Sequence, residues 1–385
     1  MHRRRFLALS AMSALPVTPA LALPEPGADT ADTAAAQHQV TLLFAGDLMQ
    51  HDGQIKAART ADGGYDYSDV FARVAPEIKR HDIAVANLEV TLAGPPYKGY
   101  PNFSAPDEYM HAAVDAGFNV LLTANNHCCD TRGKGLRRTI EQMDARRVQH
   151  LGTYLNLEER QRKYPLIIEC NNIRIALLNF TYGTNGMPIP APFVVNLEDS
   201  RQIAKDIADA QASGADVIIA FPHWGIEYAL LPSAEQRKRA AWLLEKGVHH
   251  IIGSHPHVVQ PFEVTTDQNG EPHLTVFSLG NYVSNMTRPN TDGGAMVTMT
   301  LTKKDGKTTM SDCGYSLFWV SRPATSKQKN FRIYPASWPT DEMNDAERSL
   351  RERYLASTRE LLEKHNQGIK ETLAHTPDTA ASPQT

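Results

Sequence analysis

The chain has 385 residues, of which 42% are hydrophobic and 21% are charged. This balance is ordinary for a globular protein with one large domain or two modest ones. The formal net charge is −4, and the sequence contains no basic stripe or long run of lysine and arginine. We therefore expect no nucleic acid partner.

Residues 1–22 have the features of a cleaved signal peptide. An arginine cluster precedes a weakly apolar run, and the small-residue pattern ALA follows at 20–22. The run is too short, and too interrupted by proline, to span a bilayer as a mature helix. The stretch RRRFL at 3–7 resembles a twin-arginine export signal, although an ordinary secretory signal with a basic start would also fit. We expect an exported protein, periplasmic or extracellular.

Residues 23–38 are rich in Pro, Ala, Asp and Thr and indicate a flexible leader. From residue 39, short apolar runs alternate with helical patterns. The runs predict strands at 40–45, 82–86, 119–123, 173–180, 216–221, 248–252 and 274–279. Three helical patterns between them stop at Gly117, Gly214 and Gly247. This alternation predicts an α/β domain, at 39–338, with a largely central sheet.

The character of the chain changes near residue 339. Leu350, Tyr354 and Leu361 follow a helical spacing of roughly three or four residues per turn, among many charged residues. This predicts a C-terminal amphipathic helix within 339–375 that packs on the domain by one stripe, rather than binding a partner. Residues 376–385 are expected to be a disordered tail.

Four cysteines are present, and their spacing is not that of a zinc finger. An oxidising compartment would permit disulfides, but the sequence predicts no pairing. A direct bond between Cys128 and Cys129 would be strained, so we expect separate partners or free thiols. The other two cysteines are Cys170 and Cys313.

Polar residues collect where five of the expected strands end. They are Asp47; Asn87 and Glu89; Asn125, Asn126 and His127; His223 and Glu227; and His255 and His257. Each alone would be an ordinary turn, cap or packing residue. In open α/β sheets, however, ligands bind beyond the carboxyl ends of the strands. The coincidence at five strand ends therefore indicates a functional site.

These residue types suit a divalent transition metal. Imidazole nitrogens with carboxylate and amide oxygens fit Zn, Mn, Fe or Ni, whereas Ca or Mg would prefer oxygen alone. The lone pairs of His255 and His257 can converge, because the two residues lie on an extended loop stiffened by Pro256. A carboxylate shared between two ions would make a binuclear centre, so we expect one or two ions.

Six motifs carry a resemblance to a known family. They are LLFAGDLM, DIAVANLEVTLAG, GFNVLLTANNHCCD, FPHWGIEY, IIGSHPHVVQP and FSLGNYVSN. Their order, over roughly residues 40–285, resembles that of CapA-type poly-γ-glutamate capsule biosynthesis proteins, which are related to the calcineurin-like metallophosphoesterases. The resemblance implies a four-layer α/β/β/α sandwich with a metal centre at one edge of the sheets.

The resemblance also implies roles for single residues. The implied metal ligands are Asp47 and His257 for one ion, Asn126, His223 and His255 for the other, and Glu89 as the bridge. His127 would be the general acid. Three departures from the superfamily pattern weaken the expectation of phosphoesterase activity. Met49 stands where an Asp-x-His motif has its histidine, Glu89 replaces an aspartate, and Cys128 replaces an acid.

Glu227 lies four residues after His223. It could be a general base or a partner of a ligand, or simply an acid in an exposed turn. Trp224 and Tyr228 could line a substrate groove, although core packing is the default expectation for each.

Four further residues are expected to support the ligands. Asn281 would brace the floor of the site, and Asn87 and Asn125 would lie beside the ligands. Asp130 could orient His127, but we favour it as the cap of a helix that begins near Gly133.

The expected function is that of an exported, metal-dependent hydrolase-like protein. It would act in biosynthesis, export or processing of an anionic cell-envelope polymer, such as poly-γ-glutamate. Water activated by metal would attack a phosphoester or amide, and His127 would protonate the leaving group. One alternative is a non-catalytic factor that binds the polymer through the metal and hands it to an envelope synthesis or export complex. Another is a metal-dependent Cα epimerase.

Overall fold

The computed structural model describes residues 37–372. The expected signal peptide at 1–22, nearly all of the leader at 23–38 and the tail at 376–385 lie outside the described residues. Within the described part, no helix combines the length and hydropathy needed to cross a membrane.

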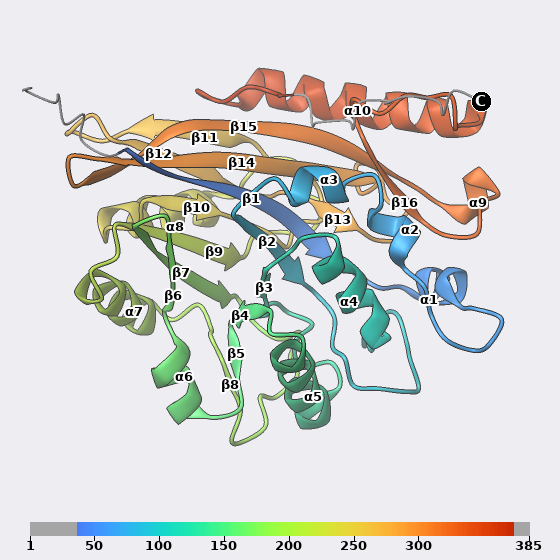
Figure 1. Ribbon diagram of the computed structural model, residues 1–385, viewed down its shortest axis with the longest axis horizontal. Coiled ribbons are helices and arrows are strands. Elements are labelled where there is room, and N and C mark those ends of the chain that lie inside the picture. Colours follow the sequence, from blue (N-terminus) through green and yellow to red (C-terminus); the bar gives the residue numbers. More distant parts are fainter. Residues whose placement is uncertain (1–36, 373–385) are drawn as a thin grey trace, which may run out of the picture. The chain divides into compact units, whose positions relative to one another are not determined.

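The first sheet has the strand order β16-β15-β14-β1-β2-β3-β4, with β13 paired to β1 (Figure 1). Strands β1 to β4 run parallel, whereas β14, β15 and β16 are antiparallel to their neighbours. The bounds are β1 His38–Leu48, β2 Ile83–Leu88, β3 Val120–Leu122, β4 Gln149–Leu151, β13 Asn281–Val283, β14 Gly293–Lys304, β15 Lys307–Ser321 and β16 Arg332–Pro335.

The second sheet has the order β11-β12-β10-β9-β7-β6, and its four central strands, β12, β10, β9 and β7, run parallel. The bounds are β6 Leu166–Cys170, β7 Ile173–Thr181, β9 Val217–His223, β10 His250–Ile252, β11 Phe262–Thr266 and β12 Pro272–Val276. A separate two-stranded ribbon joins β5 (Thr153–Tyr154) to β8 (Val194–Val195). Each of the seven expected strand segments coincides with or overlaps an observed strand.

The two sheets pack face to face, because alternate residues of a strand point to opposite sides. In β1, Leu42 and Phe44 join the core between the sheets, while Leu43 and Ala45 join a second core beneath the helices. The ring of Phe44 lies 5.8 Å from that of Phe221 in the opposite sheet. Both sheets are therefore covered on both faces over their central strands.

Helices form the outer layers. Helices α2, α3 and α4 share a core with the outer face of the first sheet, and α7 and α8 share the main core with the second. The expected four-layer α/β/β/α sandwich is therefore confirmed. The helices are α1 Asp52–Ala58, α2 Ser68–Phe71, α3 Ala75–Ile78, α4 Asp107–Asp115, α5 Arg132–Ala145, α6 Leu157–Lys163, α7 Ser200–Ala212, α8 Ala234–Glu245, α9 Pro323–Ser326 and α10 Asp345–His365.

The C-terminal helix α10 lies along β15 (Figure 1). Asn344 caps it, and the side chain of Glu347 completes a capping box. Its buried stripe includes Tyr354 and Leu362, whereas Leu361, which we expected in the stripe, is only half-buried. The helix is also shorter than the segment expected to contain it.

Candidate metal centre

The expected ligands come together at the carboxyl ends of the parallel strands. Asp47 lies in β1, Glu89 directly follows β2, and His223 is the last residue of β9. Donor atoms of these three side chains lie within 4.8 Å of one another, as do donor atoms of Glu89, His255 and His257. All five side chains are buried. Glu89 belongs to both groups, as a bridging ligand would.

On one side of the cluster, hydrogen bonds orient Asp47 and His257. Asp47 Oδ1 accepts a hydrogen bond of 2.8 Å from Asn87 Nδ2. His257 Nδ1 lies 3.2 Å from Asp47 Oδ2 and 3.0 Å from Asn281 Oδ1. Two acceptors around Nδ1 favour a proton there, which leaves His257 Nε2 available, 4.0 Å from Glu89 Oε1. Asn281 thus contacts the ring of a candidate ligand.

On the other side, His223 lies between Asn126 and Ser254. Its Nε2 is 2.6 Å from Asn126 Oδ1, and its Nδ1 is 3.0 Å from Ser254 Oγ. Asn126 Nδ2 donates a hydrogen bond of 3.2 Å to Asn185 Oδ1. The amide oxygen of Asn126 therefore faces the cluster, in the orientation that a metal ligand requires.

Two buried atoms support the assignment of a metal centre. Within residues 37–372, neither Glu89 Oε1 nor His255 Nδ1 has a hydrogen-bond partner. A buried polar atom without a partner costs about 1–3 kcal/mol, so such atoms are rare unless an ion or water satisfies them. Carboxylate and imidazole donors around these atoms suit a divalent transition metal. The residues present therefore fit one or two such ions.

The protonation states of His223, His255 and Asp47 suit the same purpose. Burial lowers the pKa of His223 to about 3 and, with the charges of His223 and His257, that of His255 to about 2. Both rings therefore keep the neutral form that binds metals. Burial opposes ionisation of Asp47, but the hydrogen bond and charge of His257 outweigh it and lower the Asp47 pKa to about 2. Burial, then the charge of Asp47, raises the pKa of Glu89.

The backbone of the histidine loop is strained. His255 has φ +98° and His257 has φ +60°, and non-glycine residues rarely adopt this left-handed region. Tyr228, with φ +67°, donates its backbone N–H to Pro256 O at 2.8 Å. Such strain persists only where surrounding contacts enforce it, and it concentrates at functional sites.

His127 lies beside the cluster and is held by Asp130. Its Nδ1 is 2.8 Å from Asp130 Oδ2, which also accepts a hydrogen bond of 2.7 Å from the backbone of Phe103. Burial opposes protonation of His127, but the Asp130 hydrogen bond and the charges of Glu89 and Asp130 raise its pKa. The expectation that Asp130 caps a helix is wrong: Thr131 is at the N-cap of α5, and no side chain caps that end.

Asn87 and Asn125 connect the two parts of the site. Asn125 Nδ2 donates to Asn87 Oδ1 at 3.1 Å, and Asn125 Oδ1 accepts the backbone N–H of His127 at 3.2 Å. Asn87 Nδ2 in turn reaches Asp47 and, at 3.2 Å, Glu89 Oε2. This network fixes His127 relative to the ligands.

Other expected residues lie outside the cluster. Glu227 is exposed on the loop after β9 and belongs to neither ligand group. Met49 packs into the core beneath the helices, so its side chain does not line the site. Cys128 and Cys129 are free thiols with sulfur atoms 3.8 Å apart, and the other two cysteines are free as well.

Sequence reasoning missed Tyr182, Asn185 and Ser254. The Tyr182 ring lies 4.7 Å from that of His255, and its hydroxyl donates to Asn185 Oδ1 at 3.2 Å. Tyr182 and Asn185 follow β7, whose carboxyl end adjoins that of β9. The sequence did hold a signal for Tyr182 and Asn185. Polar residues also follow the strand expected at 173–180, whose end was not among the five considered.

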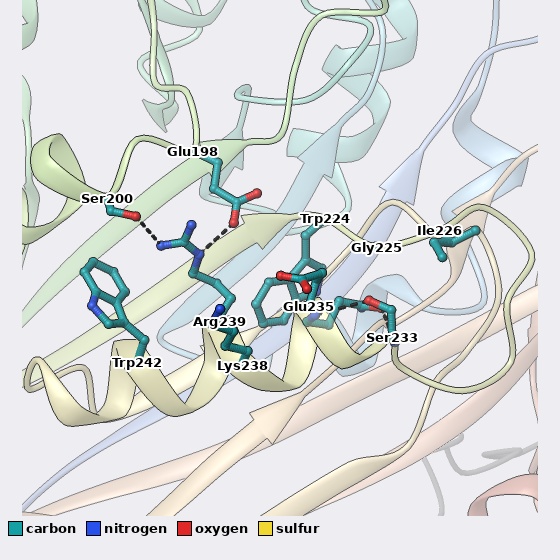
Figure 2. A pocket seen from close by; sticks show the side chains of 11 residues that line it. Glu198, Ser200, Trp224, Gly225, Ile226, Ser233, Glu235, Lys238, Arg239 and Trp242 are labelled. Atoms are coloured by element: carbon teal, nitrogen blue, oxygen red, sulfur yellow. Dashed lines mark hydrogen bonds and ion pairs between the residues drawn. The ribbon is translucent and has the colours of Figure 1, made fainter.

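A separate cavity of about 500 Å³ is lined by the loop after β9 and by helix α8, among other residues (Figure 2). Trp224, which follows His223, forms one wall, and Trp242 forms another. Between them, Arg239 forms an ion pair of 2.7 Å with Glu198 and a hydrogen bond of 2.9 Å to Ser200 (Figure 2). None of the donor residues of the cluster lines this cavity.

Comparisons with known proteins agree with the motifs. The capsule biosynthesis protein CapA of Bacillus anthracis is 29% identical over 270 residues, which cover 67% of this chain and 63% of that protein. The match thus spans less than two thirds of that relative. The PGA biosynthesis protein CapA of Bacillus subtilis strain 168 is 28% identical over 273 residues, 68% of each chain.

Among solved structures, Haemophilus influenzae NAD nucleotidase superposes with a TM-score of 0.48 and 12% sequence identity. The match covers 85% of this chain and 68% of the nucleotidase. Another is the calcineurin-like phosphoesterase YfkN from Bacillus subtilis, with a TM-score of 0.45, 16% identity and coverage of 84% and 99%. The family model described as bacterial capsule synthesis protein PGA_cap matches residues 41–286, well over half of the chain. The chain therefore belongs to the bacterial capsule synthesis protein PGA_cap family.

Proposed function

We propose that this protein is a metal-dependent hydrolase that acts on an anionic polymer of the cell envelope, poly-γ-glutamate or its precursor. The bond cleaved would be a phosphoester or an amide. One observation carries the proposal: Glu89 is shared by two groups of buried donors, and its Oε1 has no hydrogen-bond partner within the described residues. A shared carboxylate of this kind suits a binuclear hydrolytic centre.

The ligands divide into two sets. Asp47 and His257 would hold one ion, Asn126, His223 and His255 the other, and Glu89 both. Divalent ions bound there would supply Lewis acidity, which activates water near neutral pH and stabilises developing negative charge. His257 Nδ1 also forms a hydrogen bond with Asp47 Oδ2, which would keep the two side chains in place.

His127 would protonate the leaving group. Asp130 accepts a hydrogen bond from Nδ1, which leaves Nε2 as the atom that donates the proton. The backbone N–H of His127 donates a hydrogen bond to Asn125 Oδ1, which fixes the position of His127 relative to the ligands. Glu227 is exposed on its loop and belongs to neither group of donors, so it would not hold an ion.

A second candidate function is non-catalytic binding of the polymer for assembly or export. The presence of Met49 favours it, because this position offers no histidine to the first ion. Such a protein would bind carboxylates of the polymer through the ions and would not cleave the polymer.

The basic start, apolar run and small-residue pattern of residues 1–22 support a place outside the cytoplasm. The proposed partners there are the polymer and an envelope synthesis or export complex. The printed names of both CapA relatives concern capsule or PGA biosynthesis.

The test combines metal content with turnover. Protein reconstituted with Zn or Mn should contain one or two equivalents by mass spectrometry, and a His255→Ala/His257→Ala variant should lose them. His111→Ala, a histidine of α4 outside the site, is the control. His127→Ala should keep the metal while kcat for bis-p-nitrophenyl phosphate or a γ-glutamyl peptide falls by about 10²–10⁴, the usual value of a general acid. Unchanged turnover would exclude His127 as the acid, and full metal content in the double variant would exclude the centre itself.

A further inference from the structure

An arginine stands beside the metal centre with no acidic partner. Arg288 lies on the exposed loop between β13 and β14, and its guanidinium carbon is 4.3 Å from the centre of the Tyr228 ring. The same ring lies 6.1 Å from that of the ligand His257. Within residues 37–372, no carboxylate forms an ion pair with Arg288. Its positive charge is therefore available to a ligand.

Hydrogen bonds hold the backbone that carries both the ring and the cation. The backbone N–H of Tyr228 donates to Pro256 O, between the two histidines of the strained loop. On the other side, Arg288 O accepts hydrogen bonds from Thr291 N at 3.2 Å and from Thr291 Oγ1 at 2.7 Å. The backbone at Arg288 is thus a hydrogen-bonded turn, which places the start of the side chain beside Tyr228.

The arrangement suits a planar anion. A guanidinium stacked by its face on an aromatic ring keeps its edge free, and that edge matches the two oxygens of a carboxylate. The neighbouring acid Glu227 is exposed. An acidic polymer would be attracted to Arg288 and repelled by Glu227.

We propose that Arg288, which lies over the Tyr228 ring, binds a side carboxylate of the substrate beside the metal centre. This inference rests on the proposed function only in taking the substrate to be an anionic polymer. It makes Arg288 a specificity-determining residue and not a catalytic one, because it contacts a group that does not react.

The experiment measures binding of a γ-glutamyl tripeptide and of its methyl ester by calorimetry, with and without bound metal. The variants are Arg288→Ala and Arg288→Lys. Arg137→Ala is the matched control, because Arg137 is another exposed arginine, stacked at 5.3 Å on Phe193. Hydrogen bonds between charged groups are worth about 1.5–3 kcal/mol, so Arg288→Ala should weaken binding of the tripeptide by about 10- to 100-fold.

The expected pattern has three further parts. Arg288→Lys should show an intermediate loss, the ester should bind the wild type and Arg288→Ala equally, and Arg137→Ala should match the wild type. Metal content should be unchanged throughout.

Equal binding of the tripeptide by wild type and Arg288→Ala would overturn the inference, as would an equal loss for the ester. Failure of the wild type to bind millimolar tripeptide would overturn it too. The first two outcomes are independent of the proposed catalysis, which is tested by turnover of the His127→Ala variant.

Discussion

The amide of Asn126 is oriented by a residue outside the ligand set. Asn185 accepts hydrogen bonds from Asn126 Nδ2 and from the Tyr182 hydroxyl, each at 3.2 Å. Asn185 itself has φ +51°, a conformation that asparagine tolerates better than most residues. Without this acceptor, the Asn126 amide could rotate and present nitrogen, which binds no metal, to the cluster.

We therefore expect Asn185→Ala to weaken binding of one metal equivalent by about 10- to 100-fold, the usual effect of removing a group that orients a ligand. Calorimetric titration with Mn²⁺ or Zn²⁺ measures this. Asn185→Asp, which keeps an acceptor oxygen, should retain most of the affinity. The control is Asn172→Ala, which removes another asparagine of positive φ from the turn between β6 and β7. Equal affinities in wild type and Asn185→Ala would show that the ligands orient Asn126 unaided.

Among the elements, the pairing of β1 with β13 places Asp47. The backbone N–H of Asp47 donates to Gly280 O at 3.1 Å, and Asp47 pairs in register with Asn281. The two strands approach so closely that a Cβ on Gly46 would lie 1.9 Å from Gly280 O. Only glycine fits at position 46, directly before the ligand.

Gly46→Ala should consequently push β13 away from β1 and disturb Asp47, Asn281 and His257 together. We expect the free energy of unfolding to fall by about 1–3 kcal/mol, as for other overpacked sites, and metal affinity to fall as well. Urea denaturation and metal titration measure the two effects. Gly183→Ala is the control, since no heavy atom lies within 4 Å of its added Cβ. A Gly46→Ala protein with normal metal affinity would show that β13 does not position Asp47.

The elements also show where sequence reasoning succeeds. The seven expected strands have continuous apolar runs because they are buried on both faces, as parallel strands usually are. The two longest strands, β14 and β15, were not predicted. Both are antiparallel, and their apolar residues are interrupted by threonine, glycine and charged residues. Their burial depends on what covers each face, which local sequence does not reveal.

In the site, too, features set by local sequence could be predicted, and features set by tertiary contacts could not. Residues at strand ends could be predicted, because the carboxyl ends of parallel strands gather at one edge of a sheet. Ser254 and Asn185 could not, since their contacts depend on how loops fold against neighbouring strands. The positive φ values of His255 and His257 likewise follow from tertiary contacts. Asp130 was misjudged because the local cap and the distant hydrogen bond look alike in sequence.

At the scale of the whole molecule, the metal centre joins the two sheets. Asp47 and Glu89 come from the first sheet, and His223 and His255 from the second. Ions bound between them would stabilise the folded protein by an amount that grows with the logarithm of the free ion concentration divided by the dissociation constant. Unfolding measurements that concern other parts of the molecule should therefore be made on metal-free protein.

The stability of the metal-free protein should depend on pH through the second sheet as well. His250, in β10, is buried, and its Nδ1 accepts the backbone N–H of Leu274 at 3.1 Å. Protonation of Nδ1 would break that bond. Burial, with the nearby His249 and His273, lowers the pKa of His250 to about 3. His249 Nδ1 accepts a backbone N–H in the same way, at 3.0 Å from Ile218 N.

Because the folded-state pKa of His250 lies below its unfolded value of 6.5, the unfolded chain binds the extra proton between these pH values. Stability is then complete above pH 6.5 and falls as pH drops, by roughly 1.4 kcal/mol per unit well below it. His250→Asn keeps an acceptor oxygen but does not titrate. Its free energy of unfolding should therefore fall by about 2 kcal/mol less between pH 7 and pH 5 than that of the wild type.

Urea denaturation of both metal-free proteins at pH 7, 6 and 5 measures the difference. The histidines of the metal centre titrate in both proteins and cancel. Parallel pH profiles would mean that His250 is protonated in the folded protein, and that β10 tolerates the loss of its hydrogen bond to β12.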